Sequence, residues 1–508
     1  MVTTQPRTKN WTVRIGELVF GIDLRSLALF RVAIALLILV DLIGRATDLI
    51  AHYTDGGVLP RVVLFTQPLP PYAVYPLSPW ISLHMLSGSL WGQVLLFGVA
   101  GLVVIALGVG YHTRLATCVS WYLMLSLHAR NLLVSHLGDE LLRALLFWGM
   151  FVPLGACWSI DRMHSGIIPP YRRAYSVGTI ALLGQVMAMY LCTAALKLGP
   201  EWHEGSAVYY ALSMDYFVTS LGKFIRQFPN LLRVTTHVVL YGEWIGPLCL
   251  LVPVAVIRMA VVFLFILFQI CLGFGLTLGL FPWVSSIAML PFLPTWFWDQ
   301  VLPQRQTLKE TAHFVHGSHA MVGSPLMKSS LRINVLVGGL FGYVILSNLG
   351  TRSPGMHPLL ERGAWFGRCF GLNQRWDMFA TSPPRDDGWF VVPGHLQGES
   401  VVDLLTGRAV KWGKPPLISD TFKDYRWLTY FRRIWWLRDT RYPQYFAEYL
   451  CRNWNRHHQG VTRLNQLEVF YMLETTLPDY QLPRTERVLI VEQACGETDN
   501  RLAQLTKR

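Results

Sequence analysis

Long apolar stretches recur through residues 26–349 and constrain the fold more than any other feature of the chain. Each approaches the roughly 20 apolar residues that a helix needs to cross a bilayer. We expect them at 26–45, 90–110, 115–130, 141–158, 177–198, 236–257, 260–282 and 333–348. An aromatic, proline-broken stretch at 283–299 is either a re-entrant hairpin or a ninth, short crossing. The sequence therefore predicts an all-α polytopic membrane bundle of about eight to nine helices.

The composition agrees with a multi-pass integral membrane protein and argues against a nucleic-acid partner. Only 15% of the residues are charged, whereas soluble domains carry about 25%. The net charge of +13 comes from basic residues that flank the apolar stretches. The first 20 residues are polar, so we expect no cleavable signal peptide. The eight cysteines include no CxxC pair, which predicts buried free thiols and no metal site or disulfide framework.

Four regions follow from this pattern. They are a polar N-terminal segment at 1–22, a transmembrane domain at 23–300, a loop with the last membrane helix at 301–349, and an extramembrane tail at 350–508. The tail contains short β-like runs, Trp389–Val392 and Val488–Glu492, on either side of a helical section at about 420–457. We therefore predict an α+β domain close to the membrane surface.

The loop charges suggest an orientation but leave the tail open. The N-terminus, the 112–114 turn, the 162–173 loop and Arg258 fit one cytoplasmic side, because basic loops stay inside. The loops at 47–89, 130–140 and 199–235 then face the other side. Eight crossings would leave the tail in the cytoplasm, and a ninth at 283–299 would place it outside.

Lys197 lies at the end of an apolar run, where the charged ammonium group of a lysine is costly to keep. An ammonium group near lipid either snorkels to the headgroups or is kept for a task. A desolvated lysine can sit neutral and accept a proton. Gln185 lies about three turns before it on the same helix, and Gly199-Pro200 breaks the helix directly after it. A charged Lys197 can pair with Glu201 or with Glu243.

Two further pairs of ionisable residues lie in apolar stretches. Arg31 and Asp41 are ten residues apart and share a helix face, so they can pair with each other or lock helices together. Asp139 and Arg143 have the spacing of an ion pair within one helix. Asp139 can instead cap the helix or face a cavity, where it would bind a cation or orient a base.

The residues around Lys197 resemble a known family. Lys197-Leu-Gly-Pro-Glu-Trp-His-Glu-Gly205 is similar to the segment that holds the catalytic lysine of the vitamin K-dependent gamma-carboxylase. Ser26–Arg31 with Asp41, Trp158–Asp161 and Gly279–Phe281 resemble other parts of that enzyme in the same order. Together they cover about residues 23–300, the horizontally transferred transmembrane (HTTM) domain. The tail around 373–392 resembles the extension of bacterial members, which implies a bacterial inner membrane.

The resemblance implies a quinone-dependent, carboxylase-like or epoxidase-like lyase. In that enzyme a base deprotonates a reduced quinone, which reacts with oxygen and yields a base strong enough to remove a γ-proton from a peptide glutamate before carbon dioxide adds. The cofactor would be a reduced quinone with no metal, and the partners would be membrane lipid and a peptide or protein substrate. Two histidines of the carboxylase are missing, since Gln269 and the Gly138-Asp139 pair stand in their places.

Three functions stay open. The first is the enzyme with a lysine base, the second is a non-catalytic membrane maturation or partner-binding factor, and the third is a transporter with a polar path through the bundle. The candidate catalytic residues are Lys197, Glu201 and Glu204. The candidate binding residues are Arg31, Asp41, Asp139, Arg143, Gln185, Trp202 and Gln269.

Overall fold

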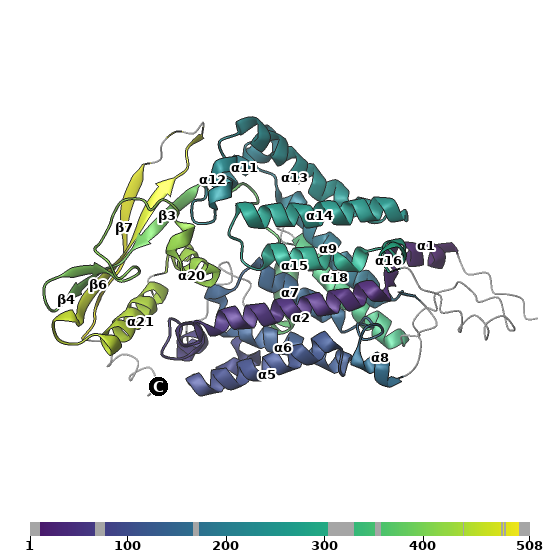
Figure 1. Ribbon diagram of the computed structural model, residues 1–508, viewed down its shortest axis with the longest axis horizontal. Helices are drawn as coiled ribbons and strands as arrows, with labels where there is room; N and C mark the ends of the chain where they lie inside the picture. Colours follow the sequence, from purple (N-terminus) through teal and green to yellow (C-terminus); the bar gives the residue numbers. More distant parts are fainter. Residues whose placement is uncertain are drawn as a thin grey trace, which may run out of the picture.

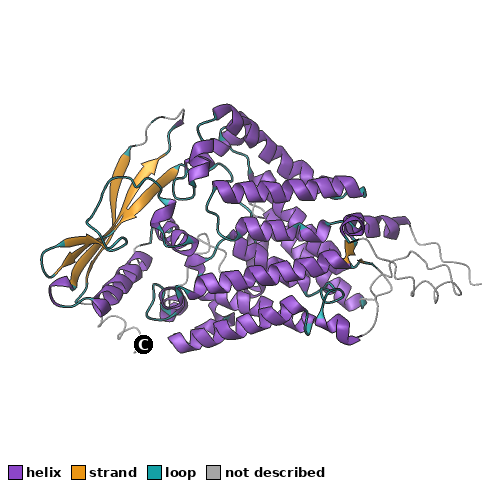
Figure 2. Ribbon diagram, in the orientation of Figure 1, coloured by secondary structure: helices purple, strands orange, loops and turns teal. Residues whose placement is uncertain are grey.

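The computed structural model describes residues 11–66, 77–165, 172–302, 330–350, 357–439, 441–478, 481 and 484–496. Residues 1–10 of the N-terminal segment predicted at 1–22, and residues 303–329 of the loop predicted before the last membrane helix, lie outside these residues. The described chain forms a bundle of helices and a smaller domain of sheet and helices (Figure 1). Figure 2 shows the five-stranded sheet beyond one end of the bundle helices. Helix α1 lies at the opposite end (Figure 1).

Ten helices make up most of the bundle. They are α1 (Trp11–Phe20), α2 (Leu24–Ala46), α5 (Leu90–Val109), α6 (Thr113–Arg130), α7 (Leu137–Gly149), α9 (Val177–Leu196), α13 (Pro229–Cys249), α14 (Ala255–Gly275), α15 (Phe281–Ala288) and α18 (Leu331–Gly350). Shorter helices fill the connections, namely α3 (Leu49–Tyr53), α4 (Arg61–Thr66), α8 (Ile160–Ser165), α10 (Pro200–Glu204), α11 (Ala207–Ser213), α12 (Ser220–Ile225) and α16 (Thr295–Val301). A two-stranded ladder pairs β1 (Ile22–Asp23) with β2 (Arg173–Ala174).

Within the described residues, five helices are long and apolar enough to cross a membrane, namely α2, α5, α9, α14 and α18. The larger count of about eight to nine is not confirmed. Helices α6 and α13 have a spanning length but more polar sequences, and α7 has only 13 residues. The aromatic stretch at 283–299 forms α15, a 3-10 turn and α16, because its prolines and short apolar runs do not sustain one helix.

The tail folds as the α+β domain that its sequence predicts. Its antiparallel strands are β3 (Asp386–Val391), β4 (Pro393–Leu396), β5 (Val401–Asp403), β6 (Leu464–Thr475) and β7 (Thr485–Ala494), and β6 pairs with β3, β4 and β7. Helices α19 (His357–Phe370), α20 (Tyr425–Trp436) and α21 (Arg441–His457) complete it. A disulfide joins Cys451 to Cys495. The prediction of free thiols is therefore wrong for this pair, because residues 44 apart in sequence meet only through the fold.

The chain after α19 enters the bundle instead of resting on it. Leu372 and Trp376 are fully buried in the same apolar core as the membrane helices. Between them, Gln374 exchanges hydrogen bonds of 2.8 and 2.9 Å with Gln185 of α9. Trp148 of α7 donates to the same Gln185 oxygen over 3.0 Å. This amide pair is satisfied inside the core and joins the tail to two bundle helices.

A carboxyl group is buried where the sheet meets the bundle. Asp387 of β3 is 2% exposed and accepts hydrogen bonds from the backbone N–H groups of Asp215 and Tyr216. Burial, together with the nearby Asp215 carboxylate, raises the pKa of Asp387 to about 7. Lys414 contacts the Asp215 carboxylate at 2.6 Å and also pairs with Glu474. Ionising Asp387 therefore adds a second negative charge beside Asp215.

We expect the folded state to lose stability as the pH rises from about 4 to 7, because folded Asp387 holds its proton where the unfolded side chain has lost it. Asp387→Asn should remove this loss and stabilise the protein at pH 8 by up to about 4 kcal/mol, the limit set by a shift of roughly three pKa units. Thermal unfolding at pH 5 and pH 8 measures the difference. Asp386→Asn, at the exposed neighbouring position, is the control. Equal stability of parent and Asp387→Asn at pH 8 would contradict this account.

Candidate functional site

Lys197 lies inside the protein and not among lipid headgroups. It is the C-cap residue of α9 and is only 3% exposed. Its Nζ forms an ion pair with Glu243 of α13 and lies 4.5 Å from the centre of the Trp202 ring. The snorkelling interpretation is therefore wrong. The helix ends here because Gly199-Pro200 starts the short helix α10, which brings Trp202 back over the ammonium group.

The loop after Lys197 is held by the tail. Trp202 Nε1 donates to the carbonyl of Phe379 over 3.1 Å, and Gly199 N donates to the carbonyl of Thr381 over 3.0 Å. The carboxylate of Glu201 accepts hydrogen bonds from Ser382 Oγ at 2.6 Å and Arg385 Nη2 at 2.9 Å.

Of the two carboxylates considered for Lys197, Glu243 is its partner. Glu201 binds Arg385 of the tail instead. Glu204, the third candidate catalytic residue, lies at the exposed end of α10.

A second pair of polar side chains joins α9 to α14. Gln269 of α14 is 1% exposed, and its Nε2 donates to the hydroxyl of Tyr190 of α9 over 2.9 Å. The Tyr190 ring packs on Phe265, with the ring centres 4.4 Å apart. Gln269 Oε1 is buried and has no hydrogen-bond partner among the described residues. Helices α9, α13 and α14 therefore bring together Lys197, Glu243, Tyr190 and Gln269, whereas Gln185 faces the tail.

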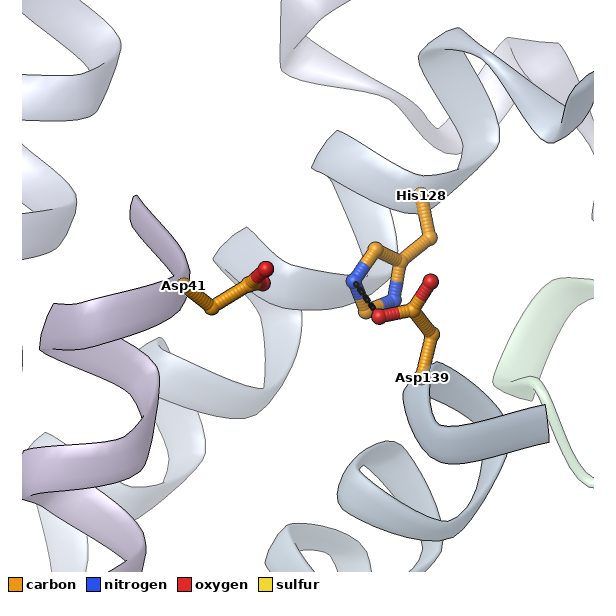
Figure 3. A group of neighbouring side chains, drawn as sticks. All are labelled: Asp41, His128 and Asp139. Carbon is orange, nitrogen blue, oxygen red and sulfur yellow. Dashed lines mark ion pairs between the residues drawn. The ribbon is translucent and has the colours of Figure 1, made fainter. Parts of the chain in front are cut away.

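A larger buried cluster lies where α2, α6 and α7 meet the tail. Asp41 accepts from Arg45 Nε at 2.7 Å and Arg426 Nη2 at 2.6 Å. Asp139 accepts from Arg45 Nη2 at 2.8 Å and from Arg426 Nη2 at 3.0 Å. Figure 3 shows the two carboxylates on either side of His128, whose Nε2 lies 3.5 Å from Asp139 Oδ1. Two arginines thus balance two carboxylates, all of them buried.

Of the two alternatives for Arg31 and Asp41, the pair within one helix is wrong, and both residues instead tie α2 to other parts of the chain. Arg31 donates to the carbonyl groups of Leu154, Cys157 and Trp158, and not to Asp41. Ten helical residues span about 15 Å, which an arginine cannot bridge even from the same face.

The second expected pair, Asp139 with Arg143, does not form either. Arg143 Nη1 hydrogen-bonds His128 Nδ1 at 2.9 Å, and Asp139 turns to Arg45 and Arg426. Asp139 also caps α7, because its side chain accepts a hydrogen bond from the backbone N–H of His136 over 3.0 Å. The capping role, one of the alternatives predicted for Asp139, is therefore confirmed.

Asp41, His128 and Asp139 have the spacing of a metal site, since one ligand atom of each lies within 4.8 Å of the others. The chemistry of the site does not fit a cation. The carboxylate oxygens already accept from the guanidinium groups of Arg45 and Arg426, which would repel a metal ion. We conclude that this cluster holds the helices and the tail together and is not a metal centre.

A family model, described as the HTTM domain, matches residues 21–296. The chain belongs to the HTTM domain family. No curated protein and no solved structure matches it. The likeness to the vitamin K-dependent gamma-carboxylase and the bacterial origin stay predictions.

The matched HTTM region supplies Lys197, Glu243, Tyr190 and Gln269. The residues that cover the lysine and close the carboxylate cluster, by contrast, come from the tail. Arg426 had no local signal in the sequence, since it lies 287 residues from Asp139. Arg45 had one, because it follows Asp41 at helical i,i+4 spacing.

We expect Arg426→Met to destabilise this HTTM protein by about 3–5 kcal/mol, because two buried carboxylates would lose one of their two arginines. Thermal unfolding in detergent measures the loss. Lys423→Met is the matched control, since the exposed Lys423 side chain pairs with the partly buried Asp48 across the same boundary between tail and bundle, and its loss should cost less than that of Arg426. If both variants melt at the same temperature, the buried cluster does not hold the tail.

Proposed function

We propose that this HTTM protein is an integral membrane enzyme that acts on a reduced, lipid-soluble quinone, with Lys197 as its base. The observation that carries the proposal is the burial of Lys197 against a single carboxylate, Glu243, beneath the ring of Trp202. Buried ionisable groups in a membrane protein are costly and are usually retained for function.

The pair has the chemistry that a proton-transfer step needs. When the proton passes from Lys197 Nζ to the Glu243 carboxylate, a neutral amine and a neutral acid remain in a site with little water. The amine can then accept the hydroxyl proton of a reduced quinone and become an ammonium ion again. Trp202 and the tail segment 379–385 cover the lysine and limit the access of water.

The resemblance to the gamma-carboxylase suggests what would follow. A deprotonated quinol reacts with oxygen there and supplies the base for glutamate carboxylation. Gln269 occupies the place of a histidine in that enzyme and is bound to Tyr190. We therefore favour the quinone step over the carboxylation step for this chain.

The two other functions have less support. A non-catalytic maturation or partner-binding factor would use the tail as its docking surface, but Leu372 and Trp376 of the tail lie in the core of the bundle. A transporter needs a continuous polar path, but the ionisable residues that could line one fall into separate groups. They are Arg31, Asp41, Asp139, Arg143, Glu243 and Lys197. Arg31 binds backbone carbonyls, Asp41 and Asp139 share two arginines, and Lys197 binds Glu243.

We further propose that the tail and the Lys197 end of the bundle lie outside the cytoplasm of a bacterium. Helix α8, which carries Arg162, and the basic 112–114 turn, whose His112 N–H donates to Asp161 of α8, lie at the end of the bundle that carries α1. The positive-inside rule assigns this end to the cytoplasm. The sheet domain lies at the other end and contains the Cys451–Cys495 disulfide. Disulfides persist in oxidising compartments such as the periplasm and are rare in the cytosol.

Reporter fusions test the orientation. Alkaline phosphatase fused after residue 508 should be active, because it folds only outside the cytoplasm, whereas a green fluorescent protein fused at the same place should stay dark. The same two reporters fused after Arg162 should give the reverse pattern. A fluorescent fusion after residue 508 would place the tail in the cytoplasm and contradict the proposal.

We expect Lys197→Ala to lower quinone turnover by about 10²–10⁴-fold, the usual contribution of a general base. The assay uses purified full-length protein with reduced quinone, oxygen and bicarbonate, and follows quinone oxidation and carbon dioxide incorporation separately. Lys411→Ala removes an exposed lysine of the tail and is the control. Turnover by Lys197→Ala at the parent rate, with an unchanged melting temperature, would exclude Lys197 as the base.

A further inference from the structure

A basic hollow lies at the junction of α12 and α13, away from the Lys197 site. It has a volume of 510 Å³ and is lined by Lys223, Arg226, Gln227 and Pro229. Two cations and an amide thus line one hollow, and the described lining residues include no acid. We call these four residues the basic hollow.

The charges behind the basic hollow hold its two cations in place. Lys223 Nζ and Arg226 Nη1 each lie 3.6 Å from Asp215 Oδ1, and Lys223 Nζ donates to the carbonyl of Pro416 over 2.7 Å. Asp215 also binds Lys414 at 2.6 Å. Lys414 pairs with Glu474 as well, so the carboxylates of Asp215 and Glu474 lie behind the three cations Lys223, Arg226 and Lys414. Both side chains keep contact with solvent, with exposed fractions of 26% and 30%.

Large apolar side chains stand next to the basic hollow and are exposed. They are Leu221, Phe224, Phe228 and Leu231, each between 45% and 56% exposed. A water-soluble surface rarely exposes two phenylalanines and two leucines so close together in sequence. Aromatic and aliphatic side chains beside lysine and arginine are typical of segments that lie at the membrane–water boundary.

The position of α12 agrees with such a boundary. Thr219, its N-cap, donates from its backbone N–H to the carbonyl of Gly275, the last residue of the apolar helix α14, over 3.1 Å. Val218 pairs with Leu276 in an isolated bridge. Helix α12 therefore sits at the level where a long apolar helix ends, beside the sheet domain (Figure 1). Lipid headgroups are expected at this level.

We propose that the basic hollow binds the phosphate headgroup of an anionic phospholipid. Lys223 and Arg226 contact the phosphate, Gln227 donates to the headgroup oxygens, and Phe224 and Phe228 lie against the acyl chains. A lipid fits better than a free anion because the exposed rings of Phe224 and Phe228, whose centres lie 5.3 Å apart, alternate in sequence with the two cations. The proposal is independent of the chemistry at Lys197.

The test uses full-length protein in nanodiscs of phosphatidylcholine with or without phosphatidylglycerol. Native mass spectrometry measures how many phosphatidylglycerol and phosphatidylcholine molecules stay bound. Each surface cation contributes about fivefold to the binding of anionic lipid, so Lys223→Gln/Arg226→Gln should lower the preference for phosphatidylglycerol by about 25-fold. The matched control, Arg408→Gln/Lys411→Gln, removes the same charge from exposed positions of the tail and should keep the preference.

A second variant guards against a loss of folding. Lys223→Arg/Arg226→Lys keeps both charges and should keep the preference, and melting temperatures in phosphatidylcholine alone report the fold of every variant. An equal loss in the control, or no preference in the parent, would overturn the proposal. If millimolar inorganic phosphate raised the melting temperature of the parent in phosphatidylcholine as much as phosphatidylglycerol does, the basic hollow would be a site for a free anion. That result would overturn the proposal as well. None of these measurements involves quinone turnover.

Discussion

Two buried carboxylates, Asp41 and Asp139, are the constraint on which the rest of the structure depends. An apolar bundle cannot hold two ionised carboxylates without partners, because each loses its hydration shell. One arginine, Arg45, comes from the same helix as Asp41, but the second, Arg426, comes from α20 of the tail. The two carboxylates therefore have both of their arginine partners only when the tail is docked. The bundle depends on the tail to pair its own buried charges.

Docking the tail also assembles the lysine site. The chain between the core residue Trp376 and strand β3 passes over α10, where the Phe379 carbonyl accepts from Trp202 and Arg385 pairs with Glu201. These contacts fix the position of Trp202, and its ring in turn covers Lys197. The HTTM region supplies the ionisable pair and the tail supplies its cover, so the site depends on both parts of the chain.

The sequence predicted what local patterns encode and missed what distant contacts decide. Apolar runs predicted the five described helices that are long and apolar enough to cross a membrane, but not the larger count. The run 389–392 predicted strand β3. Lys197 stood out because it ends such a run. The prediction that Asp41 pairs with Arg31 was wrong, because two residues can share a helix face and still lie far apart along the helix axis. Ten helical residues span about 15 Å. Arg426 could not be found, since only the folded tail brings it to Asp139. The choice of Glu243 over Glu201 likewise depended on the tail, where Arg385 engages Glu201.

The two buried charge clusters differ in a way that separates structure from chemistry. Arginine does not give up its proton in proteins, and each carboxylate of the Asp41–Asp139 cluster accepts from two arginines. The two arginines of that cluster hold the helices and the tail together but cannot hand a proton to a substrate. At the other site one ammonium group faces one carboxylate, and lysine is the cation whose proton can move when it is desolvated. A proton can therefore pass between Lys197 and Glu243 without leaving any other group unpaired, which is why our proposal assigns the proton-transfer step to this pair.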